Sequence, residues 1–156
     1  FDSAKRYDVK GKKYFETPLK YYMADVGLRN ARLNFRQVEE NHIMENVIFN
    51  ELKVRGYSVD VGVVESKETI EGKRKLKQLE IDFVANKGSK KYYIQSAYEM
   101  PTEEKLRQEK RSLIKVGDSF KKIVVVKDNI RPQTDEEGIV TMGLINFLLD
   151  QNSLDL

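Results

Sequence analysis

Cysteine is absent from the 156 residues of this chain. Its absence excludes a disulfide framework, a zinc–thiolate site and a cysteine nucleophile, and it fits a reducing compartment. No apolar run approaches the roughly 20 residues that a membrane-spanning helix needs, and no secretory signal precedes the first patterned segment. We therefore expect a cytoplasmic protein without a membrane partner.

Basic residues are missing from the end of the chain. No Lys or Arg follows Arg131, whereas five acidic residues do, so this tail carries a charge of −5. The rest of the chain holds 28 basic and 20 acidic residues, a net charge of +8 that the overall value of +3 conceals. A basic body permits contact with phosphate groups, but a solvated lysine-rich surface explains the charge equally well.

The length suits one domain with a substantial core rather than two. The chain begins at Phe1, without a methionine and already in patterned sequence, so we expect a piece of a longer protein. The predicted elements are a hairpin over Lys5–Glu16 turning at Lys10–Lys12, a strand over Tyr21–Ala24, helices over Leu28–Phe35 and Val38–Arg55, strands over Tyr57–Val64, Leu79–Ala85 and Tyr92–Tyr98, a helix over Thr102–Val116, a strand over Lys122–Val126 and a helix over Gly143–Asp150. Residues Glu65–Gln78 fit either a mobile basic loop or the continuation of a long hairpin.

The stretch Leu79–Tyr98 holds the polar residues that indicate chemistry. Two alternating segments flank a short loop of Asn, Lys, Gly and Ser, which is typical of a β-hairpin. With residues 86–91 as the loop, Ala85 pairs with Tyr92, and Asp82 then falls opposite Gln95. Because side chains alternate along a strand, this register predicts a carboxylate beside an amide oxygen on one face, as in a weakened metal site.

One glutamate of the predicted helix Val38–Arg55 lies in line with the apolar stripe of that helix. Glu45 precedes Ile48, Phe49 and Leu52 by three, four and seven residues. A carboxylate at the edge of a buried face needs a partner, because its desolvation is costly. A metal site or a salt bridge to Lys or Arg would supply one, and the spacing alone favours the salt bridge.

Two segments concentrate cations suited to phosphate groups, one before the central hairpin and one in the helix that follows it. These candidate nucleic-acid contacts are Lys73, Arg74, Lys75, Lys105, Arg107, Lys110 and Arg111. A solvated helix face is the usual explanation for such charge, and a nucleic-acid or partner surface is the functional alternative.

The order of these elements, with a carboxylate on a helix and another on the second strand after it, resembles the PD-(D/E)XK nuclease-like fold. More narrowly, the chain is similar to a C-terminal domain of unknown function found in a large family of prokaryotic AAA-type (P-loop) ATPases. The matching pieces are RYDVKGKKYFET, KYYMADVGLRN, ENVIFNEL followed by Gly56–Tyr57, EIDFVA and YYIQSAYEM, and together they span nearly the whole chain.

The resemblance implies an α/β (α+β) fold with a restriction-endonuclease-like core. In that fold a central mixed sheet is flanked by helices in the order αβββαβ, after an N-terminal hairpin and short helix and before a C-terminal helix. It also implies an ATPase and a winged-helix segment upstream, with residues 1–36 ending that segment and residues 37–156 forming the nuclease-like domain. The chain itself has no GxxxxGK[ST] run, so we do not expect it to bind ATP.

In working nucleases of this type, carboxylates bind Mg²⁺ or Mn²⁺ and a lysine positions or activates the attacking water. By position, Glu45 and Asp82 match the two acidic ligands, Gln95 stands at the next acidic position, and Ala97 stands where the lysine belongs. Glutamine retains an oxygen ligand without a charge, which weakens its affinity for a hard cation. Alanine performs neither task of the lysine, so the resemblance implies a degenerate site.

Three functions remain open from the sequence. The first is a catalytically degenerate accessory domain that binds DNA or a protein partner. The second in our ranking is a protein-interaction or oligomerisation module without nucleic-acid contact. The third is a Mg²⁺- or Mn²⁺-dependent nuclease that hydrolyses phosphodiesters, with Lys105 replacing the missing lysine and Glu80 adding a carboxylate.

Overall fold

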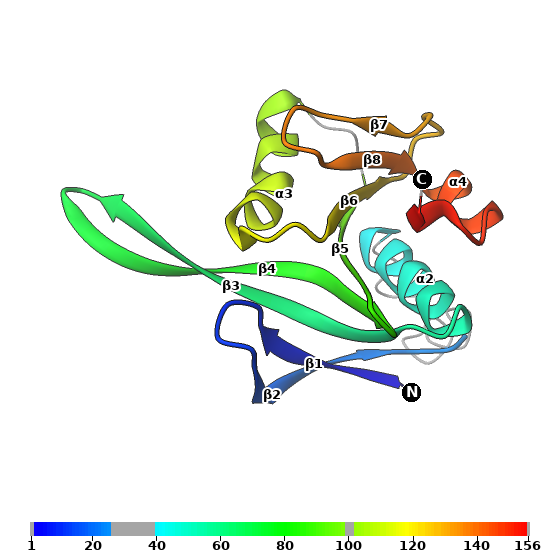
Figure 1. Ribbon diagram of the computed structural model, residues 1–156, viewed down its shortest axis with the longest axis horizontal. Helices are drawn as coiled ribbons and strands as arrows, with labels where there is room; N and C mark the ends of the chain where they lie inside the picture. The colour runs from blue at the N-terminus through cyan, green and yellow to red at the C-terminus, as the bar shows by residue number, and fades with distance from the viewer. Residues whose placement is uncertain (1, 26–39, 99–101, 156) are drawn as a thin grey trace.

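One eight-stranded mixed sheet runs through the computed structural model, which describes residues 2–25, 40–98 and 102–155 (Figure 1). The strand order across the sheet is β2-β1-β3-β4-β5-β6-β8-β7. The elements are β1 (Asp2–Asp8), β2 (Lys13–Tyr22), α2 (Glu40–Val54), β3 (Ser58–Ile70), β4 (Lys73–Lys87), β5 (Lys90–Ala97), α3 (Glu103–Val116), β6 (Lys121–Val126), β7 (Gln133–Thr134), β8 (Val140–Gly143), α4 (Leu144–Leu149) and a short 3₁₀ helix, η1 (Ser153–Asp155).

The predicted fold class is wrong in its proportions. A helix-flanked αβββαβ core was expected, but the sheet dominates, although the fold is still α+β. The N-terminal hairpin is part of the sheet, because β1 pairs in parallel with β3. At the other edge, β8 pairs in parallel with β6 and antiparallel with β7. Strands of four and two residues are too short to show a readable alternation, so this edge could not be predicted from the sequence pattern.

Most of the individual elements agree with the sequence pattern. The N-terminal hairpin turns at residues 9–12, where the backbone N–H of Gly11 donates to Asp8 Oδ1. Helix α2 and strand β6 confirm their predictions, and α2 is followed by Gly56 in the left-handed conformation. Helix α3 begins after Thr102 as expected, although no cap hydrogen bond from the Thr102 side chain forms. The predicted helix over residues 28–35 and the domain boundary at residues 36/37 lie outside the described residues.

The segment over residues 65–78 is the continuation of a long hairpin. Strands β3 and β4 stay paired from Ser58–Asn86 out to Ile70–Lys73, and the outer part projects far from the rest of the molecule (Figure 1). Glu71 and Gly72 join the strands, and both have positive φ, as a tight type I′ turn requires. We call residues 65–78 the β3–β4 arm.

Two buried clusters cover the two faces of the sheet. Helix α2 packs Ile48, Phe49 and Leu52 against one face, and α3 packs Leu113 and Val116 against the other. Strand β6 contributes alternate residues to both clusters, which is why its sequence is β-branched without interruption. None of the helices in the described ranges is long and apolar enough to cross a membrane.

Candidate functional site: a partly buried acidic cluster

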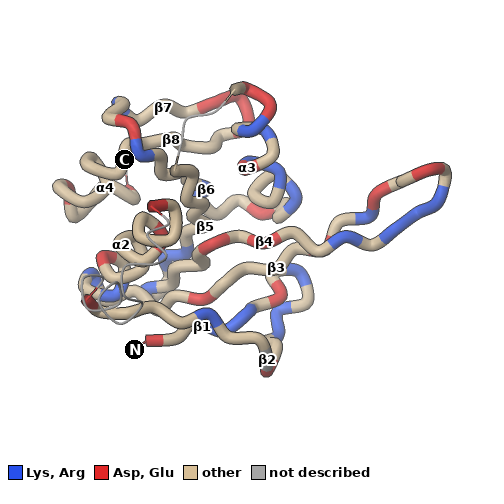
Figure 2. Tube along the Cα trace, turned by 180° about the vertical axis from the view of Figure 1, so that it is seen from behind, with Lys and Arg blue, Asp and Glu red and all other residues tan. Residues whose placement is uncertain are grey.

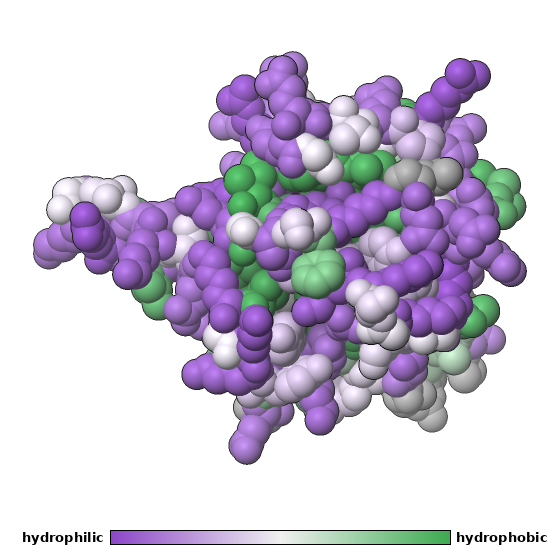
Figure 3. Space-filling view, viewed as in Figure 1, coloured by the Kyte–Doolittle hydropathy of each residue, from purple (hydrophilic) through white to green (hydrophobic). Residues whose placement is uncertain are grey.

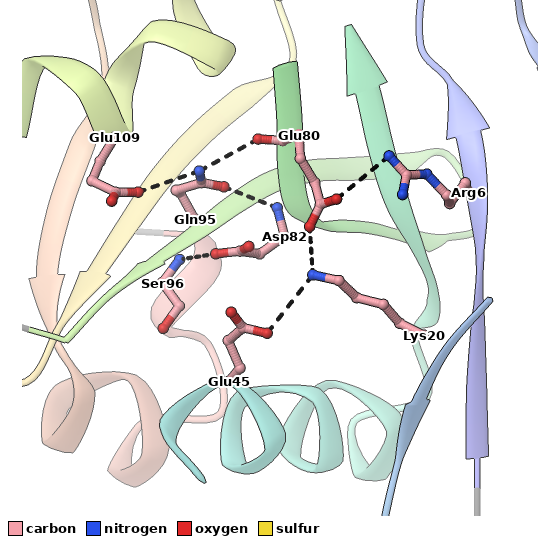
Figure 4. Close-up of polar contacts among 8 residues, drawn as sticks. All are labelled: Arg6, Lys20, Glu45, Glu80, Asp82, Gln95, Ser96 and Glu109. Carbon is pink, nitrogen blue, oxygen red and sulfur yellow. Dashed lines mark hydrogen bonds and ion pairs between the residues drawn. The ribbon is translucent and has the colours of Figure 1, made fainter. Parts of the chain in front are cut away.

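A β-bulge in β4 directs the side chain of Asp82. Asp60 and Gly62 of β3 pair with Val84 and Ile81, so β4 carries one extra residue at this point. As a result Ile81 belongs to the α3-side cluster and Phe83 to the α2-side cluster, whereas regular alternation would place both on one face. Asp82 therefore lies on the α2 side of the sheet, near Glu45 (Figure 4).

Glycine at position 62 makes room for this bulge. A Cβ atom on Gly62 would lie 2.9 Å from Val84 Cγ2 and 3.0 Å from Ile81 Cβ, both closer than side chains normally approach. The bulge was missed because nothing in a single strand shows that its partner has one residue fewer. Gly62 within an alternating strand was the available signal, since isolated glycines in strands often mark bulges.

The β4–β5 hairpin has the predicted register, with Ala85 paired to Tyr92. Pairing continues beyond them to Lys87–Lys90, so the turn is shorter than the predicted loop. At the other end of the ladder, beyond Phe83–Ile94, side chains join the strands. The backbone N–H of Asp82 donates to Gln95 Oε1 at 2.9 Å, and the backbone N–H of Ser96 donates to Asp82 Oδ2 at 2.8 Å.

Gln95 is directed away from the carboxylate of Asp82. Its Nε2 lies 3.4 Å from Oε2 of Glu109 on α3 and 3.5 Å from the carbonyl oxygen of Glu80, while its Oε1 is bound to backbone (Figure 4). The expected pairing of an amide oxygen with the Asp82 carboxylate on one face is therefore replaced by a bridge between strands and α3. The bulge is the physical reason, because it turns Asp82 to the other side.

Lys20 of β2 supplies the positive charge of the cluster. Its Nζ lies 2.5 Å from Glu80 Oε1 and 3.9 Å from Glu45 Oε2, and Arg6 Nη2 approaches Glu80 Oε2 at 3.5 Å (Figure 4). The salt bridge that the helical spacing favoured for Glu45 is thus present. Sequence reasoning did not find Lys20, because β2 reaches this position only through the order β2-β1-β3-β4 of the folded sheet.

Burial dominates the electrostatics of the cluster. Burial and, after it, the charge of Glu45 together raise the pKa of Asp82 to about 8, although the Ser96 hydrogen bond and Lys20 oppose the rise. Burial alone would lower the pKa of Lys20, but its hydrogen bond to Glu80 and the neighbouring carboxylates raise it above the usual value. At neutral pH, Lys20 is therefore charged and Asp82 is mostly protonated.

The cluster opens into a cavity of about 740 Å³ between α2 and α3. Glu45, Asp82, Ala97, Lys105 and Glu109 are among its lining residues. The structure thus brings together four positions that the sequence singled out on separate elements, including Lys105 as the proposed replacement lysine. Glu109 was not predicted, and burial raises its pKa as well.

The donor groups do not fit a divalent metal ion as they are arranged. Gln95 Oε1 accepts from backbone, an Asp82 oxygen accepts from Ser96, and the ammonium group of Lys20 lies between Glu45 and Glu80. Over the described residues, no three Asp, Glu or His side chains converge on one metal position. A hard cation needs several free oxygen ligands, and these oxygens already have partners.

The predicted nucleic-acid contacts divide into two groups. On α3, Lys110 is paired with Asp135 at 2.7 Å, and Arg111 is paired with Glu68 of the arm. Lys105 lines the cavity, and Arg107 is exposed. The remaining three, Lys73, Arg74 and Lys75, are exposed on the arm.

Comparison with known proteins gives a relative that matches almost the whole chain. The chain is 36% identical over 149 residues to an uncharacterized protein of Haemophilus influenzae, and the match covers 96% of this chain. The chain spans only about a third (33%) of the length of that protein. No protein-family model matches the chain, and no solved structure matches it significantly.

Proposed function

We propose that this chain is an accessory domain of a longer ATPase and that it binds DNA without cutting it. The position of Lys20 supports the proposal that the domain does not cut DNA. Its ammonium group lies between Glu45 and Glu80. A nuclease of the type that the sequence resembles needs those carboxylates free for a metal ion that activates water. Here the positive charge comes from the protein itself.

The proposal that this chain is part of a longer protein rests on the length of the Haemophilus influenzae relative. About two-thirds of that protein lies outside the matched part, which leaves ample length for a P-loop ATPase and a winged-helix segment. Since this chain has no phosphate-binding P-loop of its own, nucleotide chemistry would belong to those other segments. The domain described here would then supply contact with the DNA on which the ATPase acts.

DNA binding is supported by charge. The net charge of +8 before the acidic tail permits sequence-independent attraction to phosphates. Figure 2 shows basic residues gathered on β4 within the arm, away from the acidic residues of the 133–138 region.

The test is DNA affinity as a function of salt. We expect this chain to bind a fluorescein-labelled 24-base-pair duplex at 50 mM salt, with the logarithm of the affinity falling linearly as the logarithm of salt concentration rises. The slope should be about −0.9 for each phosphate contacted, and two duplexes of unrelated sequence should bind within about threefold of each other. Fluorescence anisotropy at four salt concentrations measures both quantities.

The same samples separate this proposal from the nuclease alternative. With 5 mM Mg²⁺ or Mn²⁺ present, we expect the duplex to remain intact and its affinity to be insensitive to EDTA. Cleavage that EDTA and Asp82→Ala both abolish would establish the nuclease instead. Absence of any binding at 50 mM salt would leave the protein-interaction module as the better description.

A further inference from the structure

The β3–β4 arm is a two-stranded ribbon without a hydrophobic core of its own. Its residues from Thr69 to Gln78 are all exposed, and neither sheet face of this outer part is covered by a helix (Figures 1 and 3). An isolated two-stranded hairpin is at best marginally stable in water. A ribbon of this length without a core therefore indicates contact with another molecule outside the domain.

Five cations and three carboxylates lie on the arm, and the cations are placed on both of its faces. Opposite residues of an antiparallel pair share a face. One face carries Lys73, Lys75 and Lys77, and the other carries Lys67 and Arg74. In Figure 2 the basic residues form a nearly continuous line along the β4 strand of the arm.

These cations do not stabilise the ribbon through pairs across the strands. Lys67, Lys73, Arg74 and Lys77 stand opposite Leu76, Ile70, Thr69 and Ser66, which are all uncharged. Lys75 alone stands opposite a carboxylate, that of Glu68, and Glu68 is paired with Arg111 of α3. Across the described part of the chain, no ion pair within 4.0 Å involves a cation of the arm. The positive charge is left for an external anion.

We propose that the arm enters the major groove of duplex DNA, with cations on its two faces contacting the phosphates on the two sides of the groove. This inference rests on the proposed function and adds the form of the ligand and the residues that hold it. A groove has a phosphate backbone along each wall, so a ribbon that enters it needs cations on both faces. A single flat basic surface would need them on one face only.

The dimensions of the arm agree with this placement. The major groove is about 12 Å wide and admits a two-stranded ribbon, whereas the minor groove is about 6 Å wide. From Ser66–Lys77 to Ile70–Lys73 the ribbon extends over four residue steps of about 3.4 Å, or roughly 14 Å. That length exceeds the groove depth of about 8.5 Å, so residues near the turn can reach the base edges.

Two exposed apolar side chains lie on the same segment. Leu76 is 59% exposed and Ile70 is 43% exposed. Ile70 shares a face with Lys73 and Leu76 shares the other face with Lys67, so each face of the arm exposes one apolar side chain. Apolar groups at base edges contact the methyl group of thymine, so these residues are useful inside a groove and unfavourable in water.

The deciding experiment compares two triple variants that lose the same charge. One is Lys73→Gln, Arg74→Gln and Lys75→Gln on the arm; the control is Lys10→Gln, Lys12→Gln and Lys13→Gln, three exposed residues in and directly after the β1–β2 turn. At 0.1 M salt we expect the arm variant to lose about 100-fold in duplex affinity and the salt slope to fall by about 3, since each lost phosphate contact removes about 0.9. The control should lose less than about threefold.

A chemical probe identifies the groove. Guanine N7 lies in the major groove, so saturating wild-type protein should protect it from dimethyl sulfate in a 16-base-pair duplex, and the arm variant should not. Equal losses in the two variants, or a loss without N7 protection in the wild type, would overturn groove entry while leaving DNA binding in place. Tighter binding to the single strand than to the duplex would overturn it as well. No binding by the wild type at 50 mM salt would remove the proposed function itself.

Discussion

Replacing Asp82 by Asn is expected to remove most of the pH dependence of stability between about pH 4 and pH 8. Burial raises the pKa of this carboxyl group to about 8 in the folded protein, from 3.8 in its unperturbed state. Below pH 4 the group is protonated whether the chain is folded or unfolded, so Asp and Asn should give similar stability. Between pH 4 and pH 8 only the unfolded chain releases the proton. The folded state of the wild type therefore becomes less stable, relative to the unfolded chain, as the pH rises.

The sign and size of this effect follow from proton linkage. A group with a raised pKa contributes stability at low pH and loses it as the pH rises through the folded pKa. The free energy of unfolding of the wild type should therefore fall, relative to the variant, by up to about 1.4 kcal/mol per pH unit in this window. Because a whole domain is stable by only about 5–15 kcal/mol, the difference is large. Asparagine can still accept the hydrogen bond from Ser96 N, so the network keeps its geometry.

Urea unfolding at four pH values from 4.5 to 8.5 measures the difference. Asp128→Asn, which changes an exposed carboxylate, is the matched control and should follow the wild type at every pH. A constant difference between wild type and Asp82→Asn across the series would show that Asp82 is already ionised in the folded protein. Lys20 would then affect the pKa of Asp82 more strongly than burial does.

The parts of this site that follow from local sequence were predictable, and those that depend on strand order were not. The helix of Glu45 and the pairing of Ala85 with Tyr92 depend on periodicity and loop length, which a single sequence displays. Lys20 reaches Glu80 because β1 and β2 join the sheet beside β3, and that pairing joins segments about 55 residues apart. No local pattern encodes such a contact.

The bulge shows the same limit on a smaller scale. Strict alternation correctly predicts that Phe83 and Ala85 lie on the same face of the sheet. It also predicts Ile81 on that face, whereas Ile81 lies on the opposite one. One extra residue in β4 reverses every orientation before it. The chemistry of Asp82 depends on this reversal, since without it the carboxylate would lie on the side of α3.

Replacing Lys20 by Met is expected to destabilise the protein by about 2–3 kcal/mol at pH 8.5, in the range of a broken, partly buried ion pair. Methionine keeps most of the side-chain volume and removes only the charge. Glu45, Glu80 and an ionised Asp82 would then face one another without the ammonium group that now lies 2.5 Å from Glu80 and 3.9 Å from Glu45. At pH 5.5 the loss should be smaller, because Asp82 is protonated there.

A divalent cation should partly restore this variant. With Lys20 gone, the carboxylate oxygens gain room for a hard cation, and a cation that binds only the folded state stabilises it in proportion to its concentration and affinity. We expect 5 mM Mn²⁺ to raise the melting temperature of Lys20→Met by several degrees and to leave the wild type unchanged. Lys53→Met is the control, because Lys53 forms only a half-exposed pair with Asp2 at 4.0 Å; it should change stability by less than about 1 kcal/mol and show no response to Mn²⁺.

The response of the wild type decides between the two interpretations of this cluster. If Mn²⁺ stabilises the wild type as strongly as Lys20→Met, the carboxylates are free for metal and the case for a working nuclease returns. If it stabilises the variant alone, Lys20 occupies the position that a metal ion would need. A single ammonium group on an edge strand would then be the reason why a cavity lined with carboxylates lacks metal-dependent chemistry, and the DNA contact would be left to the arm.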